Sequence, residues 1–268
     1  MKIALVQSNI HFEEKEKNLL RATSVISEEA ERGADLILFP EMSFTGFSMH
    51  TEIIGERCRE TVKRLSELAA ASGVAIGFGW VAFREKEPEV VDGGSAADGK
   101  KLAENRYTII GKNGNVISEF TKLHPFSYAG EDYFYRGGEN VVEYELEGIP
   151  CSTFICYDLR FPEAFRKVGE RAHMVLVPAN WPASRAEHWK TLLRARAIEN
   201  QVYILGINCV GHMNGQDYSG DSCVITPDGN VQASLSGEEG VVRYELQDNV
   251  EEYRKGFPVW KDYRNMSS

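Results

Sequence analysis

The stretch that decides the fold reads Ile149-Pro-Cys-Ser-Thr-Phe-Ile-Cys156-Tyr-Asp-Leu-Arg160-Phe-Pro162-Glu-Ala-Phe. Its first part, residues 151–155, is a short apolar run with β-branched residues, which predicts a buried strand. Pro162 and the residues after it indicate the start of a helix, because proline is tolerated in the first turn of a helix. Cys156 is therefore predicted to lie where a strand ends and the chain turns toward a helix.

The position of Cys156 has two interpretations. In an α/β fold, the turn after a strand is where a nucleophile is exposed, and a cysteine sulfur is a strong side-chain nucleophile near neutral pH. Alternatively, Cys156 is a small buried core residue, which is the more common fate of a free cysteine. A single cysteine does not decide between the two.

The residues before this stretch alternate between strand and helix patterns. Short apolar runs predict strands, whereas apolar residues spaced three or four apart predict helices. The predicted strands cover 2–8, 35–39 and 74–83, and the predicted helices carry Leu19, Ala22, Ile26 and Ala30, then Val62, Leu65 and Ala69. This alternation predicts a layered α/β fold with buried strands.

Local signals place further elements along the chain. Lys112-Asn-Gly-Asn115 predicts a hairpin turn between strands 106–111 and 116–121. Ser184 and Glu187 fit a capping box that opens a helix, whose apolar stripe consists of Trp189, Leu193 and Ala197. Residues 85–100 are charged and glycine-rich, which predicts a surface loop.

The chain shows no linker, internal repeat or low-complexity tract, so the sequence predicts a single domain over residues 1–268. Its end, from about residue 247 to 268, is polar with scattered aromatic side chains. A tail of this kind packs either on its own chain or at a dimer interface, and the sequence leaves both arrangements open.

Composition excludes several classes of function. The 268 residues carry a net charge of −10 at pH 7, so nucleic acid is not an expected partner. No apolar run is long enough to span a membrane, and the N-terminus opens in a strand pattern rather than a signal peptide. The five cysteines contain no CxxC pair and fit a reducing compartment better than a disulfide framework. We therefore expect a cytoplasmic protein.

Three reactive residues follow predicted strands. Glu41 comes after the strand that ends near residue 39, and Lys122 and Cys156 directly follow the strands 116–121 and 151–155. Because α/β folds form sites at the carboxyl ends of strands, we expect the three side chains in one cleft. Taken singly, Glu41 could be a solvated loop acid and Lys122 an ordinary surface cation.

Together the three residue types make a hydrolytic site. Glu41 could take the thiol proton so that Cys156 attacks a carbonyl or nitrile carbon. The ammonium of Lys122 could then neutralise the oxyanion, and the backbone N–H of Tyr157, the residue after the nucleophile, is the natural second donor.

These residues lie in three blocks that resemble the signature blocks of the nitrilase superfamily of carbon–nitrogen hydrolases. The blocks are Pro40-Glu41-Met with Thr45-Gly-Phe-Ser-Met49, then Lys122-Leu-His124, then Cys156-Tyr-Asp-Leu-Arg160-Phe-Pro162-Glu163. They occur in the order found in the family, and the similarity covers nearly the whole chain.

The resemblance implies both a fold and a set of site residues. The fold it implies is a four-layer αββα sandwich that usually forms a homodimer through its helices. The site it implies is a Glu–Lys–Cys triad made of Glu41, Lys122 and Cys156. A second glutamate of the family corresponds to Glu131 in the pair Gly130-Glu131, where it would orient the substrate and position Lys122.

Within the superfamily the chain is most similar to the ω-amidases, which hydrolyse the terminal amide of 2-oxoglutaramate or 2-oxosuccinamate. Further likeness lies in Asn180-Trp-Pro182, His188-Trp189 and Ala195-Arg-Ala-Ile-Glu-Asn200. The sequence departs from the pattern at Pro125, where a leucine is expected before Phe126. The resemblance implies ammonia release through a Cys156 thioester, although N-carbamoyl amino acid, aliphatic amide and nitrile hydrolases would use the same triad.

A substrate of this kind carries a carboxylate, which a net-acidic protein must meet with a specific cation. Arg160 is the candidate, because a guanidinium binds a carboxylate in a bidentate manner. Its alternative role is a structural salt bridge to Glu163 or Asp158. Asn180 and Trp181 follow a strand and are expected at the edge of the pocket, unless Trp181 belongs to the core.

Other functional classes have less support. His124 lies close to Lys122 and could serve a Cys–His thiol hydrolase, but no third polar group nearby in sequence would orient it. No metal is expected, because the histidines lack metal-ligand spacing, and no nucleotide cofactor is expected, because Gly77-Phe-Gly79 lacks the third glycine of a dinucleotide fingerprint. A non-catalytic metabolite-binding protein with the same fold remains the alternative to an enzyme.

Overall fold

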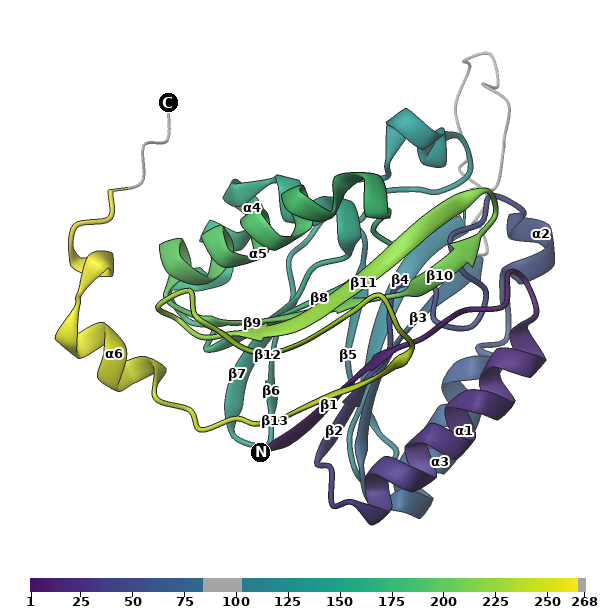
Figure 1. Cartoon of the computed structure of the whole chain (residues 1–268), viewed down its shortest axis with the longest axis horizontal. Helices are drawn as coiled ribbons and strands as arrows, with labels where there is room; N and C mark the ends of the chain where they lie inside the picture. The colour runs from purple at the N-terminus through teal and green to yellow at the C-terminus, as the bar shows by residue number, and fades with distance from the viewer. Residues whose placement is uncertain (84–102, 265–268) are drawn as a thin grey trace, which may run out of the picture.

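The structure is a computed structural model that describes residues 1–83 and 103–264. Two mixed β-sheets pack face to face, and helices cover the outer face of each sheet (Figure 1). The layers are therefore helix, sheet, sheet and helix, which confirms the predicted αββα sandwich. The surface loop predicted at residues 85–100 lies outside the described residues.

The first sheet combines the strands of the N-terminal half with one late strand, in the order β13-β1-β2-β3-β4-β5. Their bounds are Lys2–Gln7 for β1, Leu36–Leu38 for β2, Ala75–Phe83 for β3, Ala103–Ile110 for β4, Val116–Thr121 for β5 and Gly240–Glu245 for β13. β1, β2 and β3 are parallel, and β4 and β5 follow as antiparallel neighbours. Two successive antiparallel pairings make β5 parallel to β2, so both strands end at the same edge.

The second sheet has the order β10-β11-β9-β8-β7-β6, with β12 paired to β11. Its strands are β6 Glu143–Leu146, β7 Ile149–Thr153, β8 Met174–Ala179, β9 Tyr203–Asn208, β10 Val210–Met213, β11 Gln216–Ile225 and β12 Val231–Ser236. The central strands β7, β8 and β9 are parallel. The carboxyl ends of β7 and β8 therefore also share one edge.

The helices pack on the outer faces through apolar residues at helical spacing. α1 (Lys15–Glu31) and α3 (Glu60–Ser72) cover the first sheet, whereas α4 (Pro162–Gly169) and α5 (Ala186–Asn200) cover the second (Figure 1). α2 (Thr51–Ile54) is a single turn. The buried faces include nearly all the residues from which the helices were predicted, and only Ala30 is half-buried. The buried ones are Leu19, Ala22 and Ile26, Val62, Leu65 and Ala69, and Trp189, Leu193 and Ala197.

The strand period of two separates the layers of the core. In β1, Ile3 and Leu5 point into the layer between the two sheets, whereas Ala4 and Val6 pack against α1 and α3. Both faces of this strand are buried, which explains why its sequence is a continuous apolar run rather than an alternating one.

Two local predictions were wrong in detail. The strand before Cys156 covers Ile149–Thr153 rather than residues 151–155. The capping box at Ser184 and Glu187 does not form, because a 3-10 turn, Ala183–Arg185, contains Ser184 and α5 begins only after Arg185. By contrast, the hairpin after β4 is confirmed by the backbone hydrogen bond from Gly111 to Asn115.

The C-terminal tail packs on its own chain. It contains α6 (Val250–Gly256) and a 3-10 turn at Val259–Lys261. The Arg254 guanidinium donates to the backbone carbonyls of Gly169, Glu170, Ala172 and Asn200, near the C-terminal ends of α4 and α5. A cation is favoured there, because the last carbonyls of a helix lack partners within the helix.

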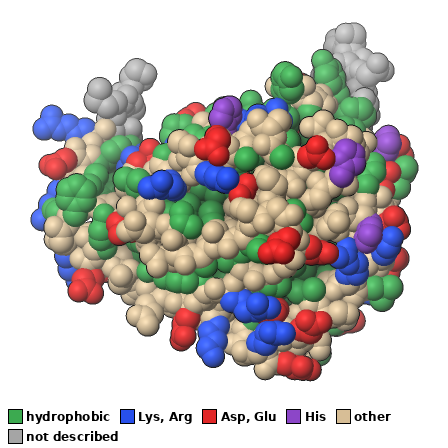
Figure 2. Space-filling model, in the orientation of Figure 1, with side chains coloured by type: hydrophobic (Ala, Val, Ile, Leu, Met, Phe, Trp, Pro, Cys, Tyr) green, Lys and Arg blue, Asp and Glu red, His purple; other side chains and the backbone are tan. Residues whose placement is uncertain are grey.

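The surface carries charges of both signs. On the face drawn in Figure 2, acidic and basic side chains are interspersed. No helix within residues 1–83 and 103–264 is long and apolar enough to cross a membrane.

Candidate active site

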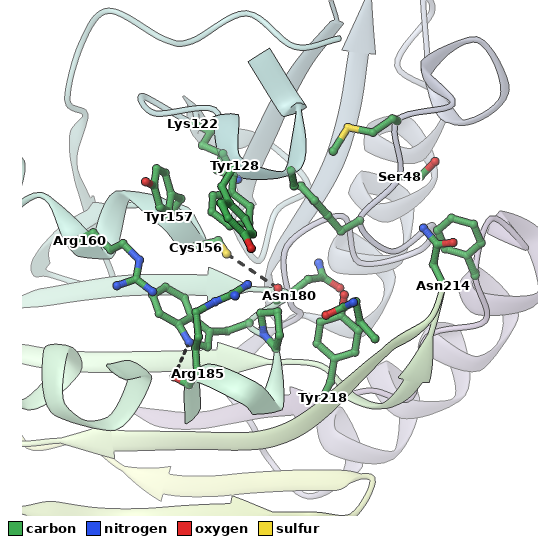
Figure 3. Close-up of a pocket in the computed structure, with 18 of the residues that line it drawn as sticks. Ser48, Lys122, Tyr128, Cys156, Tyr157, Arg160, Asn180, Arg185, Asn214 and Tyr218 are labelled. Carbon is green, nitrogen blue, oxygen red and sulfur yellow. Dashed lines mark hydrogen bonds between the residues drawn. The ribbon is translucent and has the colours of Figure 1, made fainter. Parts of the chain in front are cut away.

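A cavity of about 570 Å³ opens where the carboxyl ends of β5, β7 and β8 meet (Figure 3). Lys122 follows β5 of the first sheet, Cys156 follows β7 of the second, and Asn180 directly follows β8. All three side chains line the cavity, and Glu41, which follows β2, lies buried directly behind them. The packing of one sheet on the other therefore brings together residues that are far apart in sequence.

Cys156 occupies a strained turn between strand and helix. It is the first residue of a 3-10 helix (η3, Cys156–Arg160), and its φ angle is +46°. A cysteine rarely adopts this left-handed conformation, and strain of this kind is often found at functional sites. Cys156 is partly exposed to the cavity, whereas Cys151, Cys209 and Cys223 are buried and Cys58 lies on the surface.

The buried carboxylate of Asp158 connects this turn to the segment that carries Lys122. It accepts hydrogen bonds from the backbone N–H of Ile155 at 3.0 Å and from that of His124 at 2.9 Å. The backbone N–H of Leu123 adds a longer bond of 3.3 Å. Asp158 thereby fixes the position of the Cys156 turn relative to the end of β5.

Glu41 is fully buried and held from two sides. Its Oε1 accepts from Lys122 Nζ at 3.0 Å and from Asn105 Nδ2 at 2.8 Å, and its Oε2 accepts from the backbone N–H of Asn180 at 2.9 Å. Gly79 of β3 lies directly beneath, where a Cβ atom would come within 2.3 Å of the Met42 nitrogen. The absence of a side chain at Gly79 is what allows the Glu41 segment to pass so close to the sheet.

Lys122 lies between two buried carboxylates. Besides Glu41, its Nζ contacts Glu131 Oε2 at 2.8 Å and Oε1 at 3.1 Å. Asn105 Nδ2 also reaches both acids, with Glu131 Oε1 at 3.2 Å. An ammonium has three N–H donors, so one bond to Glu41 and one shared between the two oxygens of Glu131 leave one donor for a group in the cavity.

These contacts shift the pKa values of the two acids in opposite directions. Burial alone would raise the pKa of Glu41, but the Lys122 charge and the hydrogen bonds from Lys122, Asn180 and Asn105 outweigh it and hold the pKa below its ordinary value. Burial raises the pKa of Glu131 despite Lys122, and the neighbouring Glu41 charge adds to the rise. The carboxylate best kept ionised is therefore Glu41.

The thiol and the ammonium stay in their protonated forms. Burial and the nearby Glu41 carboxylate raise the pKa of Cys156 well above its ordinary value, against the opposing effect of Lys122. Burial would lower the pKa of Lys122, but Glu131 and Glu41 raise it well above its usual range. The site at rest thus holds a thiol beside an ionised carboxylate, an arrangement suited to general-base activation rather than to a stable thiolate.

His124 lies outside this cluster. Its Nδ1 is 2.7 Å from Asp158 Oδ1, and its ring stacks on Phe161 with centroids 3.7 Å apart. The polar partner that the sequence did not reveal for His124 is therefore Asp158, and no hydrogen bond joins His124 to Cys156 among the described residues.

The predicted pocket residues line the cavity as expected from their places after strands. Tyr157, Arg160, Asn180 and Trp181 all contribute to its wall. Arg160 forms no salt bridge to Asp158 or Glu163; instead its guanidinium lies 4.7 Å from the Trp181 ring, and it contacts His188 Nδ1 at 3.3 Å. Trp181 is also part of the core, so its two interpretations are both correct.

Three polar residues near the cluster were not predicted as site residues from the sequence. Asn105 lies within β4, Arg185 opens α5, and Asp158 was considered only as a partner for Arg160. None has a distinctive local pattern, because their partners belong to other strands and loops. The one available signal was Asp158, which stands two residues after the candidate nucleophile inside the Cys156 block.

Among the described residues, no group of three or more histidine, cysteine, aspartate or glutamate side chains could hold a metal ion.

Comparison with known proteins identifies relatives that cover nearly the whole chain. A family model described as carbon-nitrogen hydrolase matches residues 2–255. The chain is 35% identical over 267 residues to a 2-oxoglutaramate amidase of Bacillus subtilis (strain 168), covering 98% of this chain and 97% of that protein. It is 33% identical over 268 residues to the omega-amidase YafV of Escherichia coli (strain K12), covering 98% and 96%.

Solved structures give the same answer for the fold. XC1258 from Xanthomonas campestris, a CN-hydrolase superfamily protein with an arsenic adduct in its active site, matches with a TM-score of 0.87 at 29% identity, covering 100% of this chain and 98% of that chain. Nit3 of Saccharomyces cerevisiae, a member of the nitrilase superfamily, matches with a TM-score of 0.82 at 23% identity, covering 97% and 94%. The sequence motifs, the αββα sandwich and these matches lead to one conclusion: the chain belongs to the carbon-nitrogen hydrolase family.

Proposed function

We propose that this carbon–nitrogen hydrolase is a thiol amidohydrolase that releases ammonia from the terminal carboxamide of a small 2-oxo acid, with 2-oxoglutaramate or 2-oxosuccinamate as the substrate. One observation carries the chemical part of the proposal. A partly exposed cysteine in a strained turn and a buried ammonium line one cavity, and a buried, ionised carboxylate lies directly behind them.

In the first half-reaction, Glu41 takes the Cys156 proton while the sulfur bonds to the amide carbon. The carbonyl oxygen becomes an oxyanion, which the free N–H of Lys122 and the backbone N–H of Tyr157 stabilise. Tyr157 suits this role because the first amide groups of a helical turn have no acceptor within the turn. Glu41 then returns the proton to the amide nitrogen, the C–N bond breaks, and ammonia leaves a Cys156 thioester.

In the second half-reaction, water replaces the amine. Glu41 removes a proton from the water as its oxygen attacks the thioester carbon, and the same two donors hold the oxyanion. The C–S bond then breaks, Cys156 regains its proton from Glu41, and a carboxylic acid leaves. Glu131 and Asn105 support this cycle by fixing Lys122 and Glu41, so that neither has to reorganise during the reaction.

The 2-oxo acid part of the proposal rests on the cavity's cations and on the two relatives. The Bacillus subtilis and Escherichia coli proteins are a 2-oxoglutaramate amidase and an omega-amidase. Arg160 faces the cavity without a carboxylate partner among the described residues, so its guanidinium is available to the carboxylate of such a substrate.

Ammonia release tests this proposal against the alternatives that share its triad. 2-Oxoglutaramate is compared with a neutral aliphatic amide, an N-carbamoyl amino acid and a nitrile, each with the wild type and Cys156→Ala. We expect turnover of the 2-oxo acid amide that is abolished in Cys156→Ala. Turnover of another substrate alone would contradict the substrate assignment, and no turnover with an unreactive Cys156 would favour a metabolite-binding protein.

Two further properties belong to the proposal. We expect a homodimer formed through the helical layers, in keeping with the family resemblance. We also expect a cytoplasmic location, because all five cysteines are free in the structure, as is usual in a reducing compartment.

A further inference from the structure

Arg185 lies at a position where local helix energetics disfavour a cation. It is the N-cap residue of α5, and the first acid of that helix, Glu187, points to solvent and pairs with Lys190 instead. The N-terminus of a helix carries a partial positive charge, so an arginine there is unfavourable unless something compensates for it. A residue that contradicts a local rule without a visible structural gain is a candidate for a functional role.

No ion pair within the described part of the chain offsets this unfavourable charge. Arg185 has no carboxylate partner there, and its guanidinium instead lies over the Phe126 ring, 5.5 Å from its centroid. Its backbone oxygen accepts a hydrogen bond from Trp181 Nε1, which fixes the turn that carries it. The side chain is thus held at the cavity wall with its N–H donors unused.

Arg160 lines the same cavity, where Figure 3 labels both arginines, and it too has no carboxylate partner among the described residues, although its guanidinium contacts His188 Nδ1 at 3.3 Å. Burial lowers the pKa of Arg160, and the charge of Arg185 lowers it further. Two like charges at one wall repel each other, and the N-terminus of α5 adds positive potential there. An anion between the two guanidinium groups would remove this repulsion.

We propose that Arg185 is a specificity-determining residue that, together with Arg160, binds the carboxylate of the substrate between two guanidinium groups. The inference rests on the proposed function for the identity of the substrate. The Phe126 ring orients Arg185 by contact with its guanidinium and packs on Tyr157 with centroids 4.7 Å apart. Phe126 directly follows Pro125, where the sequence departs from the ω-amidase pattern.

Direct binding tests the site without turnover. The affinity of 2-oxoglutaramate is measured by isothermal titration calorimetry in the Cys156→Ala background, alone and combined with Arg185→Gln or Arg185→Lys. We expect Arg185→Gln to weaken binding about 10- to 100-fold, the usual effect of losing a hydrogen bond to a charged group. Arg185→Lys should lose part of the affinity, because an ammonium lacks the planar fork of a guanidinium.

Arg194→Gln is the matched control. Arg194 is an exposed arginine of the same helix that bonds to the Gly229 carbonyl and does not line the cavity, so its replacement should leave the affinity unchanged. The combined Arg160→Gln and Arg185→Gln variant should lose less than the product of the two single losses, because both residues hold one carboxylate.

Two outcomes would overturn the inference. One is an unchanged affinity in Arg185→Gln, and the other is an equal loss for 2-oxoglutaramate and for pentanamide, a neutral amide of the same chain length. Binding that depends on Arg185, in a protein whose wild type releases no ammonia from 2-oxoglutaramate, would confirm the anion site and contradict the proposed function. The two proposals therefore fail separately.

Discussion

At the scale of single residues, the site depends on charges that control one another's protonation. Lys122 holds Glu41 in its ionised form, and Glu41 in turn keeps Cys156 a thiol. In the proposed mechanism the proton that moves lies on sulfur, and its acceptor is the Glu41 carboxylate. Lys122, the proposed oxyanion donor, is kept positive by Glu131 and Glu41. One cluster thus prepares both proton transfer and charge stabilisation.

Replacing the base should therefore be far more harmful than replacing the neighbouring histidine. Glu41→Gln keeps the shape of the side chain but cannot accept the thiol proton, and we expect kcat/KM to fall by about 10²–10⁴-fold. His124→Gln should cost much less, because His124 contacts Asp158 and Phe161 rather than Cys156. Steady-state ammonia release measures both, and the reverse ranking would favour a Cys–His mechanism.

The acidic limb of the pH profile should distinguish the same two mechanisms. The pKa of Glu41 is held below its ordinary value, so the base remains ionised as the pH falls and is lost only below that ordinary range, near 4.3. We expect kcat/KM to be nearly constant between about pH 5.5 and 7.5. A histidine base would instead give a decline below about pH 6.5. Such a decline, in enzyme shown to remain folded, would contradict Glu41 as the base.

At the scale of elements, the turn between β7 and α4 determines where Cys156, the proposed nucleophile, lies. It carries Cys156 at a positive φ angle, and Asp158 connects it to the residues after β5, on the other sheet. The buried Asp158 carboxylate therefore helps to set the geometry between Cys156 and Lys122. Displacement of reacting groups by about 1 Å can cost on the order of 100-fold in rate.

Asp158→Asn tests this connection. The amide offers one acceptor where two oxygens now receive backbone N–H groups, so we expect kcat to fall by about 10- to 100-fold with a smaller change in KM. Asp132→Asn is the control, since Asp132 is exposed in the neighbouring 3-10 turn. A lower unfolding temperature, with kcat per folded molecule unchanged, would mean that Asp158 has only a structural role.

At the scale of the whole molecule, sheet-on-sheet packing creates the site, and the C-terminal tail packs against the other end of the helices α4 and α5. Arg254 bonds to four backbone carbonyls around the ends of α4 and α5. Phe257 remains exposed on the same tail, with 61% of its surface accessible. The tail therefore has one face on its own chain and another available to a partner subunit.

Arg254→Met tests whether the contact of the tail with its own chain stabilises the fold. The variant removes hydrogen bonds to four backbone carbonyls, three of them in partly buried positions, and we expect the free energy of unfolding to fall by about 1–3 kcal/mol. Activity per folded molecule should be unchanged, because the tail does not line the cavity. Full stability in Arg254→Met would contradict the anchoring role.

The oligomeric state of the wild type is a separate prediction. Sedimentation should give twice the chain mass of 30.1 kDa. A wild-type monomer would contradict the homodimer.

The features that could be predicted from the sequence are those with local causes. Strands such as Lys2–Gln7 and the turn at Cys156 follow from local apolar runs, glycine and proline, and the signature blocks identified the family. The positions of Asn105 and Arg185 near the site could not be predicted from the residues next to them in the sequence. Asn105 acts across 64 residues on Glu41, and that proximity exists only once β4 lies beside β3 and the sheets have packed.

The capping box at Ser184 failed for a similar reason. The pattern of Ser184 and Glu187 is a valid helix start in isolation, but the chain leaves β8 through Asn180 and Trp181, both held by buried hydrogen bonds. The 3-10 turn that follows absorbs Ser184 and gives the N-cap position to Arg185. Tertiary contacts thus overrode a local preference at the wall of the cavity.

The most direct test of the account is the detection of the covalent intermediate. Wild-type enzyme turning over 2-oxoglutaramate is quenched in acid, and its intact mass and peptides are measured by mass spectrometry. We expect an adduct with the mass of the substrate minus ammonia, located on Cys156 and absent from Cys156→Ala. Ammonia release without such an adduct, or with the adduct on another residue, would contradict Cys156 as the nucleophile.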